Sequence, residues 1–272
     1  MTTANKAIGI FDSGMGGLTV MRALTKHLPQ ENFLYLGDTA RLPYGTKSAD
    51  TVRRYAIQCG EALIARDVKM VVIACNTASV ALAAVQQALA PVPVIGVIEP
   101  GAEAAIMAAG DGPIAVIATE GTVKGGAYRT AIRAQGANMP ILQQPCPLFV
   151  PMAEEGLIDG PIAEAIARRY LEPVLASVPA PSCLLLGCTH YPALKDVIAR
   201  VTGPGIKLVD SAETTANAVA SLLGEMNLQT PPKGTGTRRF LATDAPDRFA
   251  RVGEIFLGEP IDPGSVELID LQ

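Results

Sequence analysis

The chain has 272 residues, of which 49% are hydrophobic and 18% are charged, a composition typical of globular proteins rather than of disordered chains. Because 22 Lys and Arg residues stand against 26 Asp and Glu residues, the net charge is −4, and no general positive field is available to bind nucleic acid. The five cysteines include no CxxC pair, and with only two histidines they give little support to a disulfide framework or a zinc site.

Short apolar runs alternate with longer amphipathic segments along most of the chain, which is the pattern of a parallel α/β fold. Strands are predicted over residues 7–11, 33–36, 70–74, 94–98, 114–117, 184–186 and 206–209. Helices are predicted over residues 17–27, 49–66, 78–89, 162–176 and 214–223. Near the C-terminus, a strand over 238–242, a helix over 247–257 and a strand over 266–271 are predicted.

Residues 70–98 contain no charged side chain and are numerous enough to span a bilayer. Pro91, Pro93 and several polar residues interrupt this stretch, so a buried strand, a helix and a second strand explain it better. The first ten residues also show no basic and apolar signal sequence. We therefore expect a cytoplasmic protein without a membrane partner.

Three junctions between a strand and the following loop recur in the same order in the two halves of the chain. IGIFDSG, VVIACNTAS and VIGVIEPG in the first half correspond to IAVIATEG, LLLGCTHYP and IKLVDSAE in the second. The offsets are 107 for Gly14 and Gly121, 113 for Cys75 and Cys188, and 112 for Val97 and Val209. Similar offsets favour two related α/β units, although any α/β chain yields some such coincidences.

Cys75 and Cys188 follow two predicted strands in the same context, after a small residue and close to a threonine. The carboxyl ends of parallel strands are where α/β proteins place ligands, and a helix N-terminus there favours thiolate over thiol. An isolated cysteine is more often a small buried hydrophobe, which is how we interpret Cys59, Cys146 and Cys183. Two cysteines at matched positions beside hydroxyl and amide groups instead predict a pair of reactive thiols.

Two thiols facing each other across a cleft suit the inversion of a carbon centre. One thiolate removes a proton from one face, while the opposite thiol delivers a proton to the other face. Each thiol then acts as a base in one direction and as an acid in the other. Because a free thiol is only slightly ionised at neutral pH, each needs a neighbour that lowers its pKa or accepts its proton.

Polar residues in the right segments could assist the thiols, and each also has a plainer interpretation. Asp12 and Ser13 end the first predicted strand, where either could simply cap the next helix, and the glycines after them permit close approach of the backbone to a ligand. His190 is two residues beyond the second cysteine and could be a proton partner or a surface histidine. Glu154 could be a partner or an acid in the first turn of a helix.

Seven segments of the chain resemble those of bacterial glutamate racemases, which belong to the cofactor-independent aspartate/glutamate racemase superfamily. The segments are GIFDSGMGGLTV, LGDTARLPYGTKS, VVIACNTAS, VIGVIEPGA, CPLFVPMAEEG, LLLGCTHYPAL and LVDSAETTA. They occur in the same order, at ordinary spacing and over nearly the whole chain. GCTH together with FDSGMGG favours the glutamate enzymes over aspartate racemases, which more often carry Glu after the second Cys-Thr.

This resemblance implies roles for individual residues. Cys75 and Cys188 would be the two acid/base residues, with Asp12 assisting the first and with Glu154 and His190 assisting the second. Substrate contacts are implied for Asp12, Ser13, Tyr44, Gly45, Asn76, Thr77, Thr189 and His190. Hydroxyl, amide and backbone N–H groups can bind two carboxylates and an ammonium group without adding a strong base that competes for protons.

The resemblance also implies the fold and the domain organisation. We expect two similar parallel-sheet α/β domains related by pseudo-twofold symmetry, with the active site in the cleft between them. Residues 1–98 and 212–272 would form the first domain, and residues 99–211 the second.

The function implied by the resemblance is interconversion of L- and D-glutamate, which supplies D-glutamate for peptidoglycan. Glutamate would be the small-molecule partner, and no metal, pyridoxal phosphate, nucleotide or other cofactor is implied. Some members have a long N-terminal extension and require a cell-wall precursor as activator. Because few residues precede the first predicted strand, such regulation is not expected here. The sequence leaves a monomer and a homodimer open.

Three other functions stay open at the level of sequence. A cysteine hydrolase or transferase could use one thiol as a nucleophile with His190 as base, but the second matched cysteine would then be unexplained. A pyridoxal-dependent racemase needs a lysine, and Lys47 and Lys195 have no evident cofactor context. A solute-binding or regulatory protein could have the same two-domain cleft without turnover.

Overall fold

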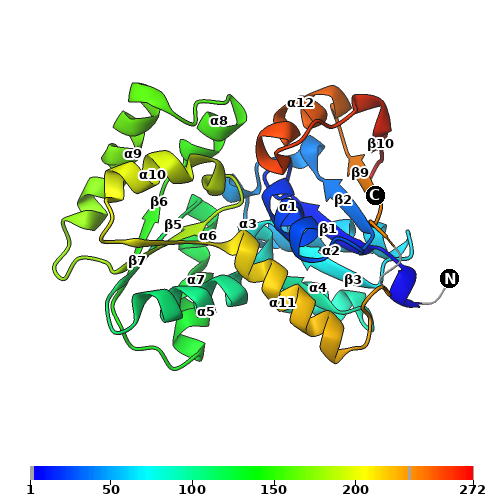
Figure 1. Ribbon diagram of the computed structural model, residues 1–272, viewed down its shortest axis with the longest axis horizontal. Coiled ribbons are helices and arrows are strands. Elements are labelled where there is room, and N and C mark those ends of the chain that lie inside the picture. Colours follow the sequence, from blue (N-terminus) through cyan, green and yellow to red (C-terminus); the bar gives the residue numbers. More distant parts are fainter. Residues whose placement is uncertain (1–2, 232–233, 272) are drawn as a thin grey trace.

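Each half of the molecule is built around a parallel β-sheet (Figure 1). The computed structural model describes residues 3–231 and 234–271. Residues 1–2, 232–233 and 272, which belong to the first predicted domain, lie outside the described residues. Helices pack on both faces of each sheet, so each half has three layers. The predicted class, two parallel-sheet α/β domains, is confirmed.

The first sheet has six strands in the order β10-β9-β2-β1-β3-β4, and all of its neighbouring strands are parallel. The strands are β1 (Ile8–Asp12), β2 (Phe33–Gly37), β3 (Met70–Ile73), β4 (Val94–Gly96), β9 (Arg238–Ala242) and β10 (Val266–Leu268). Successive side chains point to opposite faces, so Ile10 of β1 enters one apolar cluster and Phe11 enters the other.

Two groups of helices bury these two faces of the first sheet. One face packs against α1 (Leu18–His27), α11 (Ser211–Glu225) and α12 (Pro246–Leu257). The opposite face packs against α2 (Ala49–Ile64) and α4 (Leu82–Leu89). The C-terminal strands β9 and β10 and helix α12 therefore pack with the N-terminal elements of the first sheet.

The second sheet has four parallel strands in the order β6-β5-β7-β8. They are β5 (Ile114–Ala118), β6 (Ile141–Pro145), β7 (Cys183–Gly187) and β8 (Lys207–Asp210). One face is covered by α8 (Phe149–Glu154), α9 (Gly160–Leu175) and α10 (Lys195–Thr202). The other is covered by α5 (Ile98–Ala109) and α7 (Ala127–Ala134).

The strand order β2-β1-β3-β4 of the first sheet recurs in the second sheet as β6-β5-β7-β8. This pairs β1 with β5, β3 with β7 and β4 with β8, the same pairs that the sequence offsets relate. The chain enters the second half through α5 and leaves it through α11, and the predicted domain boundaries fall at the first residues of these two helices. The division into these residue ranges stays a prediction.

Several elements differ from those expected from the sequence. The predicted strand 94–98 ends earlier, at Gly96, and α5 begins at Ile98. Pro100 lies in the first turn of α5, where a proline is tolerated. The predicted helix 78–89 is two helices, α3 (Asn76–Ser79) and α4. Strand β6 was not predicted, because two glutamines and Pro145 break the apolar pattern, and such residues are tolerated at a sheet edge.

Residues 70–96 contain β3, α3, α4 and β4, so the predicted order of a strand, a helical segment and a second strand is confirmed, with two helices in place of one. Within the described residues, none of the helices combines the length and the apolar character that crossing a membrane requires.

Candidate active site

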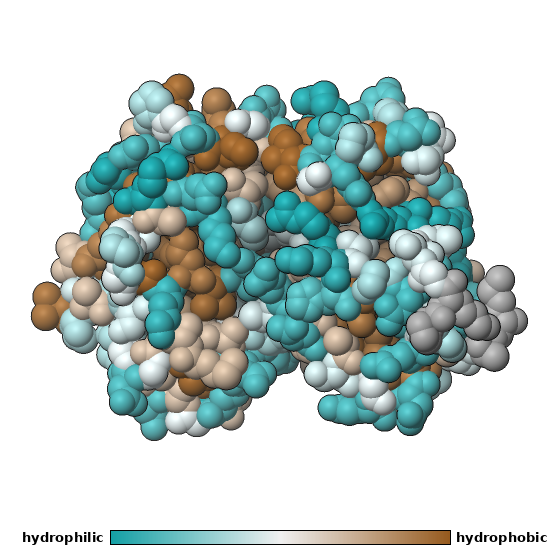
Figure 2. Space-filling model, viewed as in Figure 1, coloured by the Kyte–Doolittle hydropathy of each residue, from teal (hydrophilic) through white to brown (hydrophobic). Residues whose placement is uncertain are grey.

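A cavity lies where the carboxyl ends of the two sheets meet, and the outline of the molecule is indented between the two halves (Figure 2). Ser13 and Thr119 follow directly after β1 and β5, Cys188 follows directly after β7, and Cys75 is two residues beyond β3. The cavity has a volume of about 200 Å³ and is lined by both halves. Because drug-sized ligands occupy about 300–1,000 Å³, this cavity suits a small metabolite.

The cavity brings together all of the predicted site residues except Asp12. These lining residues are Ser13, Tyr44, Gly45, Cys75, Asn76, Thr77, Glu154, Cys188, Thr189 and His190. Asp12 is fully buried, and its carboxylate accepts hydrogen bonds from the Gly14 N–H at 2.9 Å and from the Thr189 hydroxyl at 3.4 Å. Asp12 therefore contacts the cavity lining through Thr189, which belongs to the other domain.

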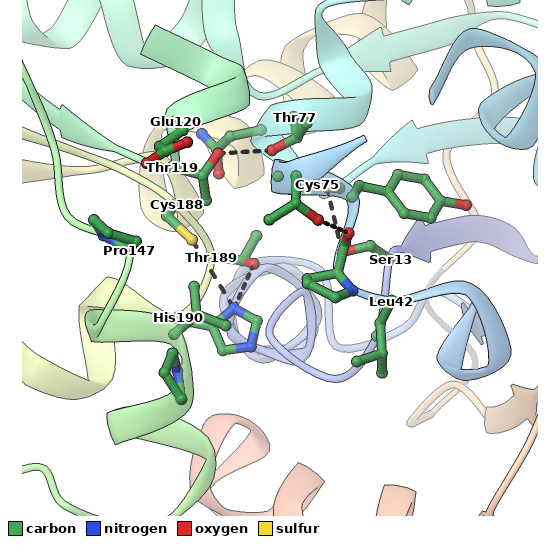
Figure 3. A pocket seen from close by; sticks show the side chains of 18 of the residues that line it. Ser13, Leu42, Cys75, Thr77, Thr119, Glu120, Pro147, Cys188, Thr189 and His190 are labelled. Atoms are coloured by element: carbon green, nitrogen blue, oxygen red, sulfur yellow. Dashed lines mark hydrogen bonds between the residues drawn. The ribbon is translucent and has the colours of Figure 1, made fainter. Parts of the chain in front are cut away.

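Cys75 lies in a buried environment at the start of α3 (Figure 3). Its thiol donates to the Ser13 hydroxyl at 3.6 Å and its sulfur accepts from the Ala78 N–H at 3.4 Å. Burial, followed by the negative charge of Asp12, raises the pKa of Cys75 to about 12. The N–H contact at the helix start lowers the pKa of Cys75, in the expected direction, but burial outweighs it. Cys75 is thus a neutral thiol at pH 7.

Cys188 belongs to a chain of three proton-carrying groups in the second domain. Its sulfur lies 3.9 Å from His190 Nδ1, and His190 Nε2 lies 3.1 Å from Glu154 Oε1. Burial lowers the pKa of His190, but hydrogen bonds with Cys188 and Glu154, and negative charge nearby, outweigh it and raise this pKa to about 10. The imidazole of His190 therefore links the Cys188 sulfur to the Glu154 carboxylate.

Two glycines of the FDSGMGG segment allow close contacts around this site. A Cβ on Gly16 would lie 2.3 Å from His190 Nδ1, and a Cβ on Gly17 would lie 2.5 Å from Asp12 Cβ. Both distances are too short for a side chain. Gly16 thus permits the first domain to approach His190 of the second domain, and Gly17 permits close packing against Asp12 within the first domain.

Asn76 supplies an unused hydrogen-bond acceptor at the cavity. Its Nδ2 donates to the Tyr128 hydroxyl at 2.6 Å. Its Oδ1 is buried and has no hydrogen-bond partner among the described residues. Because buried polar atoms are normally paired, this oxygen suits a ligand with an N–H donor, such as an ammonium group.

Sequence reasoning missed part of the cavity lining. Thr119 and Glu120 line the cavity and stand at the positions that the offset of 107 relates to Asp12 and Ser13. Applying that offset to the whole junction would have found both. No comparable signal marked the apolar lining residues, which are Leu42, Pro43, Pro147, Val150 and Pro151.

The cofactor alternatives find little support in the positions of the residues. In the part of the chain that the structure describes, no three or more His, Cys, Asp or Glu residues are grouped so that they could hold a metal ion. Lys47 and Lys195 do not line the cavity, and Lys195 pairs instead with Asp210 at 2.8 Å. Neither of these two lysines is therefore placed to hold pyridoxal phosphate at this cavity.

Known proteins resemble this chain over nearly its full length. The Asp/Glu/Hydantoin racemase family matches residues 8–219. A glutamate racemase from Geobacter metallireducens is 48% identical over 268 residues, covering 98% of this chain and 97% of that protein. The crystal structure of glutamate racemase from Francisella tularensis in complex with D-glutamate matches with a TM-score of 0.90 at 39% identity, covering 98% of both chains.

A second crystal structure agrees with the first. Glutamate racemase from Thermus thermophilus in complex with β-chloro-D-alanine matches with a TM-score of 0.88 at 44% identity, again covering 98% of both chains. Sequence and fold are therefore shared over nearly the whole length with several racemases. The chain belongs to the Asp/Glu/Hydantoin racemase family.

Proposed function

We propose that this protein interconverts L- and D-glutamate without a cofactor and supplies D-glutamate for peptidoglycan. The observation that carries this proposal is the pair of cysteines, one from each domain, that line a single small cavity. Relatives that match nearly the whole chain and are glutamate racemases support the same substrate. The cytoplasmic location stays a prediction from the sequence, which leaves a monomer and a homodimer open.

The proposed reaction needs one thiolate and one thiol. The resemblance to glutamate racemases assigns Cys188 to the L-enantiomer and Cys75 to the D-enantiomer. The Cys188 thiolate then takes the α-proton of L-glutamate, and the electron pair left on the α-carbon is delocalised into the adjacent carboxylate. Cys75 then donates its proton to the opposite face, which produces D-glutamate, a Cys75 thiolate and a Cys188 thiol. The reverse reaction uses the same groups with their acid and base roles exchanged.

The environments of the two thiols suit these starting states. The raised pKa of Cys75 keeps its proton available for donation. His190 Nδ1 lies 3.9 Å from the Cys188 sulfur and is placed to exchange a proton with it. Burial raises the pKa of Asp12, although the charge of His190 opposes this effect, so Asp12 can accept a proton more readily than an exposed aspartate. We assign Asp12 to the Cys75 side and His190 with Glu154 to the Cys188 side.

Substrate recognition would rely on neutral donors and acceptors. The described lining residues include no lysine or arginine, so the two carboxylates of glutamate would be held by hydroxyl and backbone N–H groups of residues such as Ser13, Thr77 and Thr189. The unpaired Asn76 Oδ1 would accept from the substrate ammonium group. Such contacts add no strong base that would compete with the thiols.

We expect the purified protein to racemise glutamate faster than aspartate by about 10- to 200-fold in kcat/KM, the usual discrimination for one methylene group. A site that holds both carboxylates loses one contact when the substrate is shorter. Chiral chromatography without and with added pyridoxal phosphate measures this. Dependence on pyridoxal phosphate or a preference for aspartate would contradict the proposal, and an acyl-enzyme detected by mass spectrometry would favour the hydrolase.

A further inference from the structure

We infer that Arg248 is a positioning residue for proton transfer at Cys188, and that it acts across the domain boundary through Glu154. This inference rests on the proposed racemase function. Arg248 lies on α12, which packs on the sheet of the first domain, whereas Glu154 ends α8 in the second domain. Figure 1 shows α12 facing α8 across the gap between the two sheets.

The two oxygens of Glu154 have different partners. Oε2 accepts from an Arg248 Nη at 2.8 Å, and Oε1 lies 3.1 Å from His190 Nε2. The Glu154 side chain is 11% exposed, whereas the Arg248 side chain is 39% exposed, so the carboxylate itself has little access to solvent. The terminal torsion angle of a glutamate side chain has a broad distribution. A carboxylate with only one oxygen held would therefore rotate more freely. The bond to Arg248 thus directs the other oxygen toward His190.

The same helix also fixes the imidazole ring. Phe256 of α12 is fully buried, and its ring meets the His190 ring edge to face, with centroids 4.9 Å apart and an interplanar angle of 71°. Helix α12 therefore contacts both members of the Glu154–His190 pair. The imidazole keeps Nε2 toward the carboxylate and Nδ1 toward the Cys188 sulfur.

The charge of Arg248 has a second effect on this pair. Burial raises the pKa of Glu154, but hydrogen bonds and positive charge from His190 and Arg248 outweigh burial and hold this pKa below its usual range. An ionised Glu154 accepts a stronger hydrogen bond than a protonated one. Because the chain of contacts from Arg248 leads to Cys188, loss of Arg248 would disturb one of the two proton transfers selectively.

Three variants of α12 test this inference. Arg248→Met removes the guanidinium and keeps an apolar stem, and Arg248→Lys restores the positive charge. Arg251→Met removes the same charge from an exposed position three residues further along the helix and serves as the matched control. Each variant is compared with the unmodified protein by its kcat/KM for glutamate, by its melting temperature and by primary isotope effects with α-deuterated L- and D-glutamate.

We expect Arg248→Met to lower kcat/KM by about ten- to a hundredfold, at or below the low end of the 10²–10⁴-fold contribution of a positioned acid or base. The loss is equal in both directions, because the equilibrium between enantiomers is fixed. The isotope effect should rise with deuterated L-glutamate and fall with D-glutamate, since proton transfer at Cys188 becomes the slower step. Arg248→Lys should recover most of the activity, and Arg251→Met should match the unmodified protein.

The inference would be overturned if Arg248→Met changed the isotope effect equally with deuterated L- and D-glutamate. The same loss of kcat/KM in Arg248→Met and Arg251→Met would also overturn it. A loss that follows a lower melting temperature without rescue by lysine would also overturn it, since it would indicate a purely structural role. Lack of glutamate racemisation in the unmodified protein would instead contradict the proposed function, so the two failures are distinguishable.

Discussion

Alanine in place of either Cys75 or Cys188 is expected to lower glutamate racemisation by at least about 10⁴-fold, the upper end of what a positioned acid or base contributes. Without one thiol, a proton can be exchanged on one face of the α-carbon but cannot be exchanged on the other. Chiral chromatography of each enantiomer after incubation with the variants measures this loss.

A matched control lies on the strand that leads to one of the thiols. Cys183→Ala removes a buried thiol from β7, five positions before Cys188 and outside the cavity lining, so it should retain racemase activity. Circular dichroism should show that all three variants are folded. Full racemisation by Cys75→Ala or by Cys188→Ala would exclude that thiol as an essential base.

Asp12→Asn and His190→Asn are expected to lower kcat/KM by about 10²-fold each, far less than loss of a thiol, because both thiols and the cavity remain in place. Their isotope effects should be opposite. His190→Asn should slow proton transfer at Cys188, which lies 3.9 Å from its imidazole, and so raise the isotope effect with deuterated L-glutamate. Asp12→Asn should raise it with deuterated D-glutamate.

The asparagine variants also separate a helper from the base itself. Equal and complete loss of activity in Asp12→Asn and Cys75→Ala, both in folded protein, would make Asp12 the base. Isotope effects that change in the same direction in both asparagine variants would contradict the assignment of one helper to each thiol.

The fold was largely predictable, because apolar strands and amphipathic helices leave periodic patterns in the sequence. Most predicted helices differ by only a few residues from those observed, for example 49–66 against Ala49–Ile64. The pattern failed for β6, whose five residues are all only partly buried at the edge of its sheet. A strand that buries little apolar surface leaves little periodicity to detect.

The candidate site was predictable where residues follow a strand and resemble known motifs. Contacts between distant parts of the chain were not predictable from the sequence. Glu154 and Arg248 are separated by 94 positions and come from different domains, and the local sequence presents Arg248 as an ordinary residue of an amphipathic helix. The pKa of Cys75 shows the same limit, because burial and the charge of Asp12 depend on tertiary structure.

The proposed mechanism requires that Cys75 and Cys188 act on opposite faces of the α-carbon. NMR of the α-proton, with each glutamate enantiomer at low conversion in deuterated water, measures this directly. Because the proton leaves to one sulfur and deuterium arrives from the other, the product should carry deuterium from the first turnover while the recovered substrate stays protiated. Deuterium in recovered substrate at the level found in product, or original protons returned to product, would contradict the two-thiol mechanism.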